Sequence, residues 1–464
     1  MTQNNAPDLV QAAAVDPKVF CFRGTSSEQQ KSMGMLYTPD CNGAVNDQYF
    51  AEFINYVFAV YDKTSGELVG LRYSGYQFWS LAGIRDPRGI IDPRIVFIPD
   101  AGRHGQWLAV QLNMGNGVFI ATTNPDNPDP QLYNWKASQF DLPGNDFTML
   151  GYDLNGIYIG INTAGPDNVR VPQIVFIPRA KALAHPPQVG PDDISIIGPL
   201  IHGRPPWGTD LYPMIDRSGI GWPYGTAIGI DTFSKRHLTF SLVSPQFREI
   251  ISHGLIEVEP FEPAPGGSKV RQPSINSIVQ FGGSLTGAPT GDSFNIWVAH
   301  TVQKPGQCLG VRWYRLYIDP VTRMPGPAAW GEVFDPNANY DYFNPSIVSL
   351  GKDDYTVISL SRSGNSYTST DPGSAACGNI GAYAAIVRET GSGQHTTKIV
   401  TLMSGQAPDY VPQESQVRWG DYSTICRDPD PKHPRRVWTI NEFVLKGGQT
   451  ESQWCNAIAS IDLP

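Results

Sequence analysis

The sequence predicts an all-β fold: a single seven-bladed β-propeller, with six or eight blades as open alternatives. Three observations lead there: many turn residues and aromatics, no long uninterrupted helical window, and a unit that recurs along the chain. The 464 residues include 47 Gly and 40 Pro, and 11% are aromatic. Because Gly and Pro interrupt nearly every window, the composition favours short strands joined by tight turns over long helices.

The recurring unit has a polar or Pro-bearing start, an apolar strand, a turn, and a second strand often headed by Trp or Tyr. Units begin near residues 46, 92, 147, 210, 276, 343 and 419. A four-stranded propeller blade takes about 40 to 50 residues. We therefore interpret each unit as one blade with long loops. A two-domain all-β arrangement is the structural alternative.

The two ends of the chain are expected to complete one blade together. The last strand, "QWCNAIASIDL" at 453–463, would pair with "KVFCFRG" at 18–24. Such closure removes exposed sheet edges. The sequence therefore predicts an N-terminal extension over 1–17 and a propeller domain over 18–464.

The charge pattern argues against nucleic acid and membrane partners. The formal net charge is −9 and the pI about 5.4. The chain lacks the basic stripe that tracks phosphates, and it has no apolar window long enough to span a bilayer. We expect a monomer whose partner is a small polar or saccharide ligand.

The six cysteines predict disulfides. Pairing neighbours in sequence gives Cys21–Cys41, Cys308–Cys377 and Cys426–Cys455, one of fifteen possible pairings. Reduced, buried thiols are the alternative. Disulfides would favour a secreted or periplasmic protein. The first residues contain no signal peptide, so either a leader is absent from this sequence or the protein is cytoplasmic.

Several motifs resemble a known family. "DPRIVF", "YDLNGIYIGIN", "FNPSIVSLGKDDYTVISLSRSG" and "RWGDYSTICRDPDP" are similar to secreted bacterial sialidase-like propellers of the BNR (Asp-box) type, over roughly residues 46–445. The resemblance implies a propeller of six to eight blades in a family whose activity is largely unassigned. The S-x-D-x-G core of an Asp-box is absent here, and "DPRIVFIP" only echoes the first arginine motif of sialidases. We therefore do not expect a sialidase.

Unit starts are candidates for the central channel, because the innermost strands of a propeller line it. We predict that Arg94, Arg418 and Trp419 bind substrate and that Tyr422 is catalytic. The alternative is structural: Asp421 would bond backbone N–H groups and hold Arg418, since charges in such places are usually paired. The two side chains can meet only if the chain bends at the intervening glycine.

A second candidate group lies near the end of an apolar strand, in "IWVAHTV" and the following "RWY". His300 and Tyr314 are predicted as acid and base, with Arg312 and Trp313 binding substrate; Arg312 would neutralise a carboxylate. The alternative for His300 is a satisfied core histidine. Convergence of His300, Arg312 and Arg418 in one pocket would support an enzyme, and dispersal in the blade walls would count against it.

No cofactor motif is present. The sequence contains no Walker loop, GxSxG or HExxH, and no zinc-type spacing. We predict no metal, with calcium as an open alternative at 335–341 ("DPNANYD") or 124–131 ("NPDNPDPQ"), both of which also suit ordinary turns.

These patterns favour a propeller enzyme, a lyase or hydrolase, that acts in its central funnel on a saccharide-like or other small polar substrate by acid–base elimination or hydrolysis. The alternatives are a non-catalytic secreted propeller that binds carbohydrate or a protein partner, and a structural protein with no small ligand. Fold alone does not decide among them.

Overall fold

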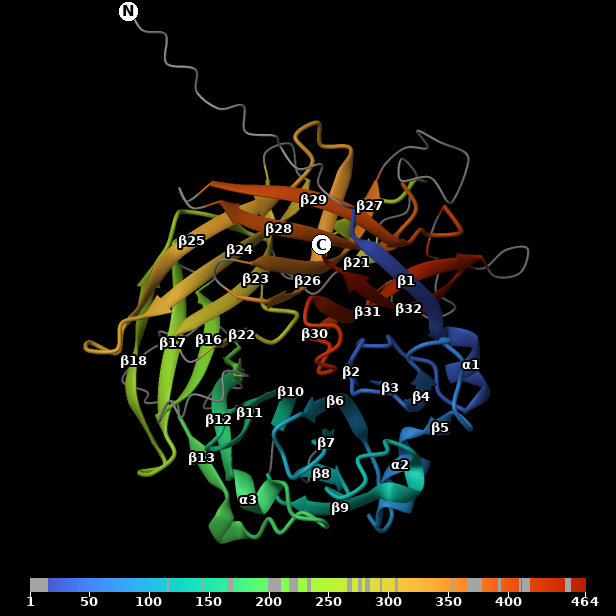
Figure 1. The fold of residues 1–464 in the computed structure, drawn as a ribbon, viewed down its shortest axis with the longest axis vertical. Helices are drawn as coiled ribbons and strands as arrows, with labels where there is room; N and C mark the ends of the chain where they lie inside the picture. Colours follow the sequence, from blue (N-terminus) through green and yellow to red (C-terminus); the bar gives the residue numbers. More distant parts are fainter. Residues whose placement is uncertain are drawn as a thin grey trace, which may run out of the picture.

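The structure is a computed structural model that describes residues 16–464, apart from 115–116, 143–144, 165–169, 199–209, 217–223, 232–234, 265–268, 274–277, 280–283, 293, 305–307, 352–353, 365–377, 391–393, 409, 411–417 and 447–451. The described strands form small antiparallel sheets arranged in a ring around a centre (Figure 1). The predicted all-β propeller is confirmed.

Four of the separate blades are each built from consecutive segments. The first contains β2 (Gly43–Val45), β3 (Tyr49–Ile54), β4 (Val57–Asp62) and β5 (Tyr73–Ser74). The next contains β6 (Ile90–Ile98), β7 (Gln106–Asn113), β8 (Gly117–Thr123) and β9 (Trp135–Phe140). The third contains β14 (Tyr212–Pro213), β16 (Gly225–Asp231), β17 (His237–Ser244) and β18 (Glu249–Glu257). The fourth contains β26 (Tyr340–Ser349), β27 (Tyr355–Gly364), β28 (Gly381–Thr390) and β29 (Gln394–Met403).

A fifth blade joins the two ends of the chain. It contains β30 (Thr424–Arg427), β31 (Arg436–Lys446), β32 (Ser452–Asp462) and the N-terminal β1 (Lys18–Ser26). β1 pairs antiparallel with β32, with Lys18 opposite Asp462 and Cys21 opposite Ala459. The expected closure by the first and last strands is confirmed, and Figure 1 shows the two lying side by side.

The remaining strands form one ten-stranded sheet. One end contains β10 (Asn145–Tyr152), β11 (Gly156–Ala164), β12 (Arg170–Pro178) and β13 (Ser195–Ile197). The other contains β22 (Thr290–Asp292), β23 (Asn295–Gln303), β24 (Leu309–Ile318) and β25 (Pro325–Val333), with β19 (Glu262–Pro263) beside β23. β15 (Ile215–Asp216) lies between the ends, and β20 (Lys269–Val270) pairs separately with β21 (Ile278–Val279).

The prediction of seven blades is wrong: five four-stranded blades stand as separate sheets. The units that begin near 147 and 276 do form antiparallel meanders. However, Ile215 pairs in parallel with Tyr152 on one side and with Thr290 on the other, which merges the two meanders into the ten-stranded sheet. Sequence periodicity detects the strands of a unit but not a short strand that bridges two units.

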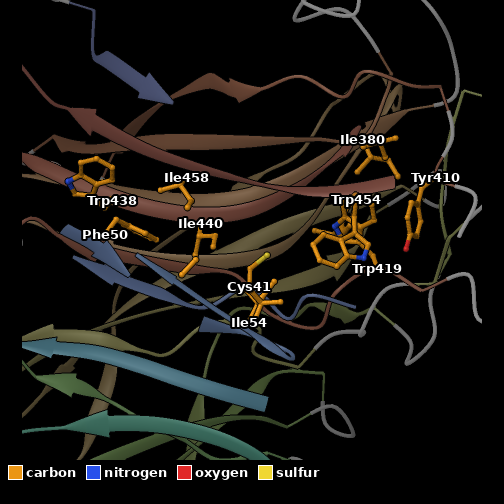
Figure 2. Packing of buried hydrophobic residues seen from close by; sticks show 14 of the residues in the cluster. Cys41, Phe50, Ile54, Ile380, Tyr410, Trp419, Trp438, Ile440, Trp454 and Ile458 are labelled. Carbon is orange, nitrogen blue, oxygen red and sulfur yellow. The ribbon is translucent and has the colours of Figure 1, made fainter. Parts of the chain in front are cut away.

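The strands are buried on both faces because neighbouring blades pack against each other. All eight residues of β7 are buried, including polar ones, so the strand does not show the alternation of a half-exposed sheet. Trp107, Trp297 and Trp438, which head second strands, are each at most 1% exposed. Figure 2 shows one such core, in which Trp438, Phe50, Ile440 and Ile458 pack between β31, β32 and the blade of β3.

The helices are short and peripheral (Figure 1). They are α1 (Ser27–Ser32), α2 (Gly75–Ala82) and α3 (Arg179–Ala182), with single 3-10 turns at Leu132–Asn134 and Pro191–Asp193. Ser74 and Gln77 cap α2 reciprocally, and Gly83 ends it with φ of 115°, a conformation that favours glycine.

Candidate functional site

The inner strands of three blades are preceded or interrupted by an Asp or Asn in the left-handed region. Asp40 (φ 50°) precedes β2, Asp92 (φ 51°) lies in β6, and Asn344 (φ 48°) lies in β26. The register of β6 shifts between Ile91 and Arg94, and that of β26 shifts between Phe343 and Ser346. Asp and Asn tolerate this conformation better than other non-glycine residues. Non-glycine residues held there often mark functional sites.

Asn55 connects two of these carboxyl residues. Its Nδ2 donates to Asp40 Oδ2 at 2.7 Å, and its Oδ1 accepts from the backbone N–H of Asp92 at 3.0 Å. Asp40 Oδ1 also accepts from the backbone N–H of Asp421 at 2.8 Å. The Asn55 amide thus joins Asp40 to Asp92, and Asp40 in turn joins them to Asp421 of the closing blade.

Tyr422 and Arg94 form the next layer. The Tyr422 hydroxyl donates to Asp92 Oδ2 at 3.4 Å, and the Arg94 guanidinium lies 3.7 Å from the centroid of the Tyr422 ring. Arg94 Nε donates to the Thr148 carbonyl at 2.6 Å. Both residues are buried, with Arg94 5% and Tyr422 2% exposed.

Arg418 and Asp421 do meet, as a bend at Gly420 would allow. Arg418 Nε donates to Asp421 Oδ1 at 3.0 Å, and the two side chains form an ion pair. The Asp421 side chain is 8% exposed, and the Arg418 side chain, at 31%, is the more open member. A Cβ on Gly420 would collide with the Glu442 carboxyl, so only glycine fits between these groups.

Burial raises the pKa values of three carboxyl groups in this cluster. The pKa of Asp40 rises to about 6, because burial outweighs the opposing charges of Arg418 and Arg94. The pKa of Asp92 rises to about 7 through burial, with further contributions from Asp40 and Asp146. Burial and the charge of Asp40 raise the pKa of Glu442 well above its usual range. The cluster therefore holds carboxyl groups that exchange protons near neutral pH.

The predicted second group lies elsewhere, in the ten-stranded sheet. His300 on β23 is opposite Arg312 on β24. In the sheet, β23 lies next to β22, and β24 is the strand after it. The His300 ring is fully buried, 4.8 Å from the Phe261 ring and stacked 5.9 Å from Tyr314. Arg312 Nε donates to Glu332 Oε1 at 2.8 Å, and its Nη1 donates to the carbonyls of Glu259 and Pro260.

His300, Arg312 and Arg418 therefore do not converge in one pocket. Their dispersal counts against an enzyme whose active site is built from these three residues. Arg312 is held in the blade wall by Glu332, whereas Arg418 pairs with Asp421 beside Asp40. Neighbouring strands are about 5 Å apart, so a residue on the third strand of a blade lies well away from the inner strand. The sequence showed that His300 and Arg312 were close, but not which strand of the blade they occupied.

The two predicted substrate-binding tryptophans are core residues. Trp313 is fully buried, with its ring 5.3 Å from that of His395. Trp419 is also fully buried; its Nε1 donates to Ser361 Oγ at 3.3 Å and its ring lies 5.2 Å from Tyr410 (Figure 2). Neither ring presents a face to a ligand in this structure.

Sequence reasoning missed Asp40, Asn55, Asp146, Asn344 and Glu442. One signal was available for Asn344, since "DPRIV" and "NPSIV" repeat the same pattern, placing Asp92 and Asn344 at equivalent points of β6 and β26. No local sequence pattern distinguishes Asn55, in the turn between β3 and β4, or Glu442, in β31. Both side chains meet the cluster because the ring of blades is closed.

A cavity of about 40 Å³ lies between the inner strands. Its lining includes Arg94 and Met149 with residues from five other segments: Asn42, Ile215, Thr286, Thr290, Ser346, Ser423 and Thr424. Two larger hollows lie away from the centre. One of about 480 Å³ borders Arg312 and Lys304, and one of about 260 Å³ borders Tyr73 and Tyr133.

The predicted disulfides are not formed among the described cysteines. None of Cys21, Cys41, Cys308, Cys426 and Cys455 is bonded to another of these five, and the predicted partner of Cys308, Cys377, lies outside the described residues. Cys426 is opposite Trp438 and Cys455 is opposite Phe443, on the two sides of β31. Five residues of strand span about 16 Å, which is beyond disulfide geometry.

Cys41 is likewise engaged elsewhere, since its thiol donates to Asn456 Oδ1 at 3.1 Å. Without these bonds, the cysteine-based argument for secretion has no support in the described part of the chain. The secreted or periplasmic location stays a prediction.

Neither calcium candidate is arranged as a metal site within the described residues, where no group of three or more His, Cys, Asp or Glu side chains could hold a metal ion. Asp335 instead accepts from the backbone of Asn337 and Asn339, and Asp129 accepts from that of Gln131. These carboxylates close turns. Within the described ranges, no helix is long and apolar enough to cross a membrane.

No family model and no curated protein sequence matches the chain. Solved structures with a similar fold include a lectin from Burkholderia pseudomallei, at 10% identity over 89% of this chain and 97% of that chain with a TM-score of 0.43. Drosophila Plexin A in complex with Semaphorin 1b is 9% identical over 97% and 88%, with a TM-score of 0.41. The endo-arabinase from Bacteroides thetaiotaomicron is 12% identical over 81% and 94%, with a TM-score of 0.31. These likenesses concern the fold alone, and membership of the sialidase-like family is not confirmed.

Proposed function

We propose that the protein is an acid–base hydrolase that acts on a saccharide-like or other small polar substrate at the end of the central channel. One observation carries the proposal. Asp92 is a buried carboxyl residue in a left-handed conformation whose pKa is raised to about 7, and it lies close enough to Asp146 and to the partly exposed Arg418 for both charges to act on it. A general acid works best when its pKa lies near the operating pH.

In this proposal Asp92 is the acid. Protonated Asp92 gives its proton to the leaving oxygen as the carbon–oxygen bond breaks. Asp146 takes a proton from water, whose oxygen forms the new bond to carbon. Hydrolysis by two carboxyl groups of different protonation state follows this scheme. Tyr422 positions Asp92 through its hydroxyl, and Arg418 contacts the polar groups of the substrate.

The test is a hydrolysis assay on a panel of aryl glycosides and polysaccharides, reading new reducing ends, with Asp92→Asn and Asp146→Asn as variants. We expect a loss of about 100-fold or more in either variant. Arg418→Ala should raise KM with little change in melting temperature. Asp335→Asn, which alters a turn aspartate far from the cluster, is the matched control. Turnover that is unaffected in Asp92→Asn, or absent from the whole panel, would contradict the proposal.

A second candidate is carbohydrate binding without turnover, which one observation favours. The hollow of about 260 Å³ is bordered by Tyr73, Tyr133, Leu71 and Leu81, and Tyr133 is 69% exposed with its hydroxyl bonded to Asp129. Exposed aromatic rings with a fixed polar edge suit stacking on a sugar face. Tyr133→Ala should then weaken binding to a glycan array, and Asp92→Asn should leave that binding unchanged.

A further inference from the structure

Arg94 is a buried cation that forms no ion pair in the described part of the chain, although the charges of Asp40 and Asp92 act on it from a longer distance. Its nitrogens donate to the Thr148 carbonyl at 2.6 Å and contact Met149 Sδ at 3.5 Å, and its plane stacks on Tyr422. Two comparably buried cations elsewhere, Lys63 and Arg312, each form an ion pair with a carboxylate. A buried charge is costly unless it is compensated.

The cavity between the inner strands lies directly against this cation. It has a volume of about 40 Å³ and is bordered by Arg94 and Ser346. Ser346 is 3% exposed, and its hydroxyl has no hydrogen-bond partner among the described residues. Buried hydroxyl groups almost always have a partner. Two donor groups, the Arg94 guanidinium and the Ser346 hydroxyl, therefore border a space with room for about one to three water-sized species.

The other polar neighbours of the cavity are already committed. Asn42 donates to Thr424 Oγ1 at 2.9 Å and accepts from the Ile95 backbone at 2.7 Å, and the Ser423 hydroxyl donates to the Asn344 carbonyl at 2.8 Å. The Arg94 guanidinium can only donate hydrogen bonds, the Ser346 hydroxyl can donate as well as accept, and Arg94 is the one charged residue among those that line the cavity. The space suits an anion rather than a cation.

We propose that this cavity binds a small monovalent anion of the halide type, held between the Arg94 guanidinium and the Ser346 hydroxyl. The volume of about 40 Å³ admits a monatomic anion. The bound anion would balance the buried guanidinium and link β6 to β26 across the centre of the ring. This site adjoins the proposed hydrolytic pair, because Arg94 stacks on Tyr422, whose hydroxyl donates to Asp92.

Thermal unfolding of the intact protein provides the first test, in sodium chloride, bromide or gluconate at equal ionic strength. Anything that binds only the folded state raises the unfolding temperature with its concentration. We expect chloride and bromide to raise it in a saturable way above the gluconate value. Ser346→Ala should weaken the apparent halide affinity about tenfold, as expected for one lost hydrogen bond. Arg94→Met should abolish the halide-specific increment.

Arg362→Met is the matched control, because Arg362 is a buried cation (6% exposed) on another strand and does not border the cavity. It should lower stability and keep the halide increment. Crystals soaked in bromide give the second test: an anomalous peak between Arg94 and Ser346 is expected. Equal unfolding temperatures in chloride and gluconate, or bromide peaks confined to the protein surface, would overturn the proposal. The salt comparison and the bromide soak both use the unmodified protein, so the proposal remains testable even if Arg94→Met does not fold.

Discussion

At the scale of single residues, the centre of the ring is built from side chains that ordinary propensities would not place there. Asp40, Asp92 and Asn344 adopt left-handed backbone conformations that turn each inner strand at its start. The hydrogen bonds of Asn55 and of the Asp421 backbone hold Asp40 and Asp92 in place. The strain is therefore offset by contacts from other blades rather than by neighbours in sequence.

The raised pKa of Asp92 gives a testable pH dependence. Its folded pKa of about 7 lies above the usual 3.8, so the stabilisation linked to its proton is complete below about pH 4 and is lost as pH rises through 7. Asp92→Asn removes this dependence while Asn keeps an oxygen to accept from Tyr422. Between pH 5 and pH 8 the unfolding free energy of the variant, relative to the native protein, should rise by on the order of 2 kcal/mol.

The measurement is chemical denaturation at both pH values. Asp335→Asn is the control, since its carboxylate lies in an exposed turn. A difference between variant and native protein that does not change with pH would show that Asp92 is charged throughout.

Gly420 gives a second prediction at this scale. A Cβ there would meet Glu442 Oε1 inside a fully packed region, where the Glu442 side chain is 1% exposed. Gly420→Ala should lower the unfolding free energy by about 1–3 kcal/mol through overpacking. Gly326→Ala is the matched control, because nothing lies within 4 Å of the position a Cβ would take at Gly326. Equal stability of the two variants in a denaturant titration would mean that Glu442 moves aside freely.

At the scale of elements, buried ion pairs and hydrogen bonds join neighbouring blades. Lys63 follows β4 and donates to Asp428, just after β30, at 2.9 Å; the two side chains are 5% and 0% exposed. Trp438 Nε1 also donates to Asp428, at 2.9 Å. This buried network fixes the first blade against the closing blade.

Lys63→Met should therefore be strongly destabilising. Removing Lys63 leaves the buried Asp428 carboxylate with the more distant Arg436 guanidinium, at 3.9 Å, as its cation partner, which costs about 3 kcal/mol. Lys235→Met is the control, since Lys235 and Glu262 form an ion pair with both side chains 54% exposed, of a kind worth about 1 kcal/mol or less. Thermal melts of the two variants should separate clearly, and similar melting temperatures would show that water reaches Asp428.

At the scale of the whole molecule, the ring depends on one non-local pairing, that of β1 with β32. Beyond the strand pairing, Thr25 donates its backbone N–H and its hydroxyl to the buried Glu52 on β3, at 3.1 and 2.6 Å. The N-terminal strand thus supplies both a sheet edge and the partner of a buried carboxylate in the next blade.

Truncation tests this closure and the predicted domain boundary together. A chain that lacks residues 1–17 should keep a cooperative thermal transition. A chain that lacks residues 1–26 loses β1 and Thr25, which exposes the edge of β32 and leaves Glu52 short of partners. It should aggregate or lose its cooperative transition. Retention of a sharp transition in the shorter chain would show that the ring does not need its closing strand.

The sequence by itself determined the all-β propeller and the joining of its two ends, and it left the pairing of Arg418 with Asp421 as an alternative. Each of these depends on short-range patterns: strand and turn periodicity, matching terminal strands, and a glycine between two charges. Only the tertiary structure decided that Asp40, Asn55 and Asp92 meet, that His300 lies in a blade wall, and that β15 merges two units. The physical reason is that those features are contacts between blades. They depend on how the ring closes and on which strand of each blade is innermost. Local sequence periodicity contains no information about either.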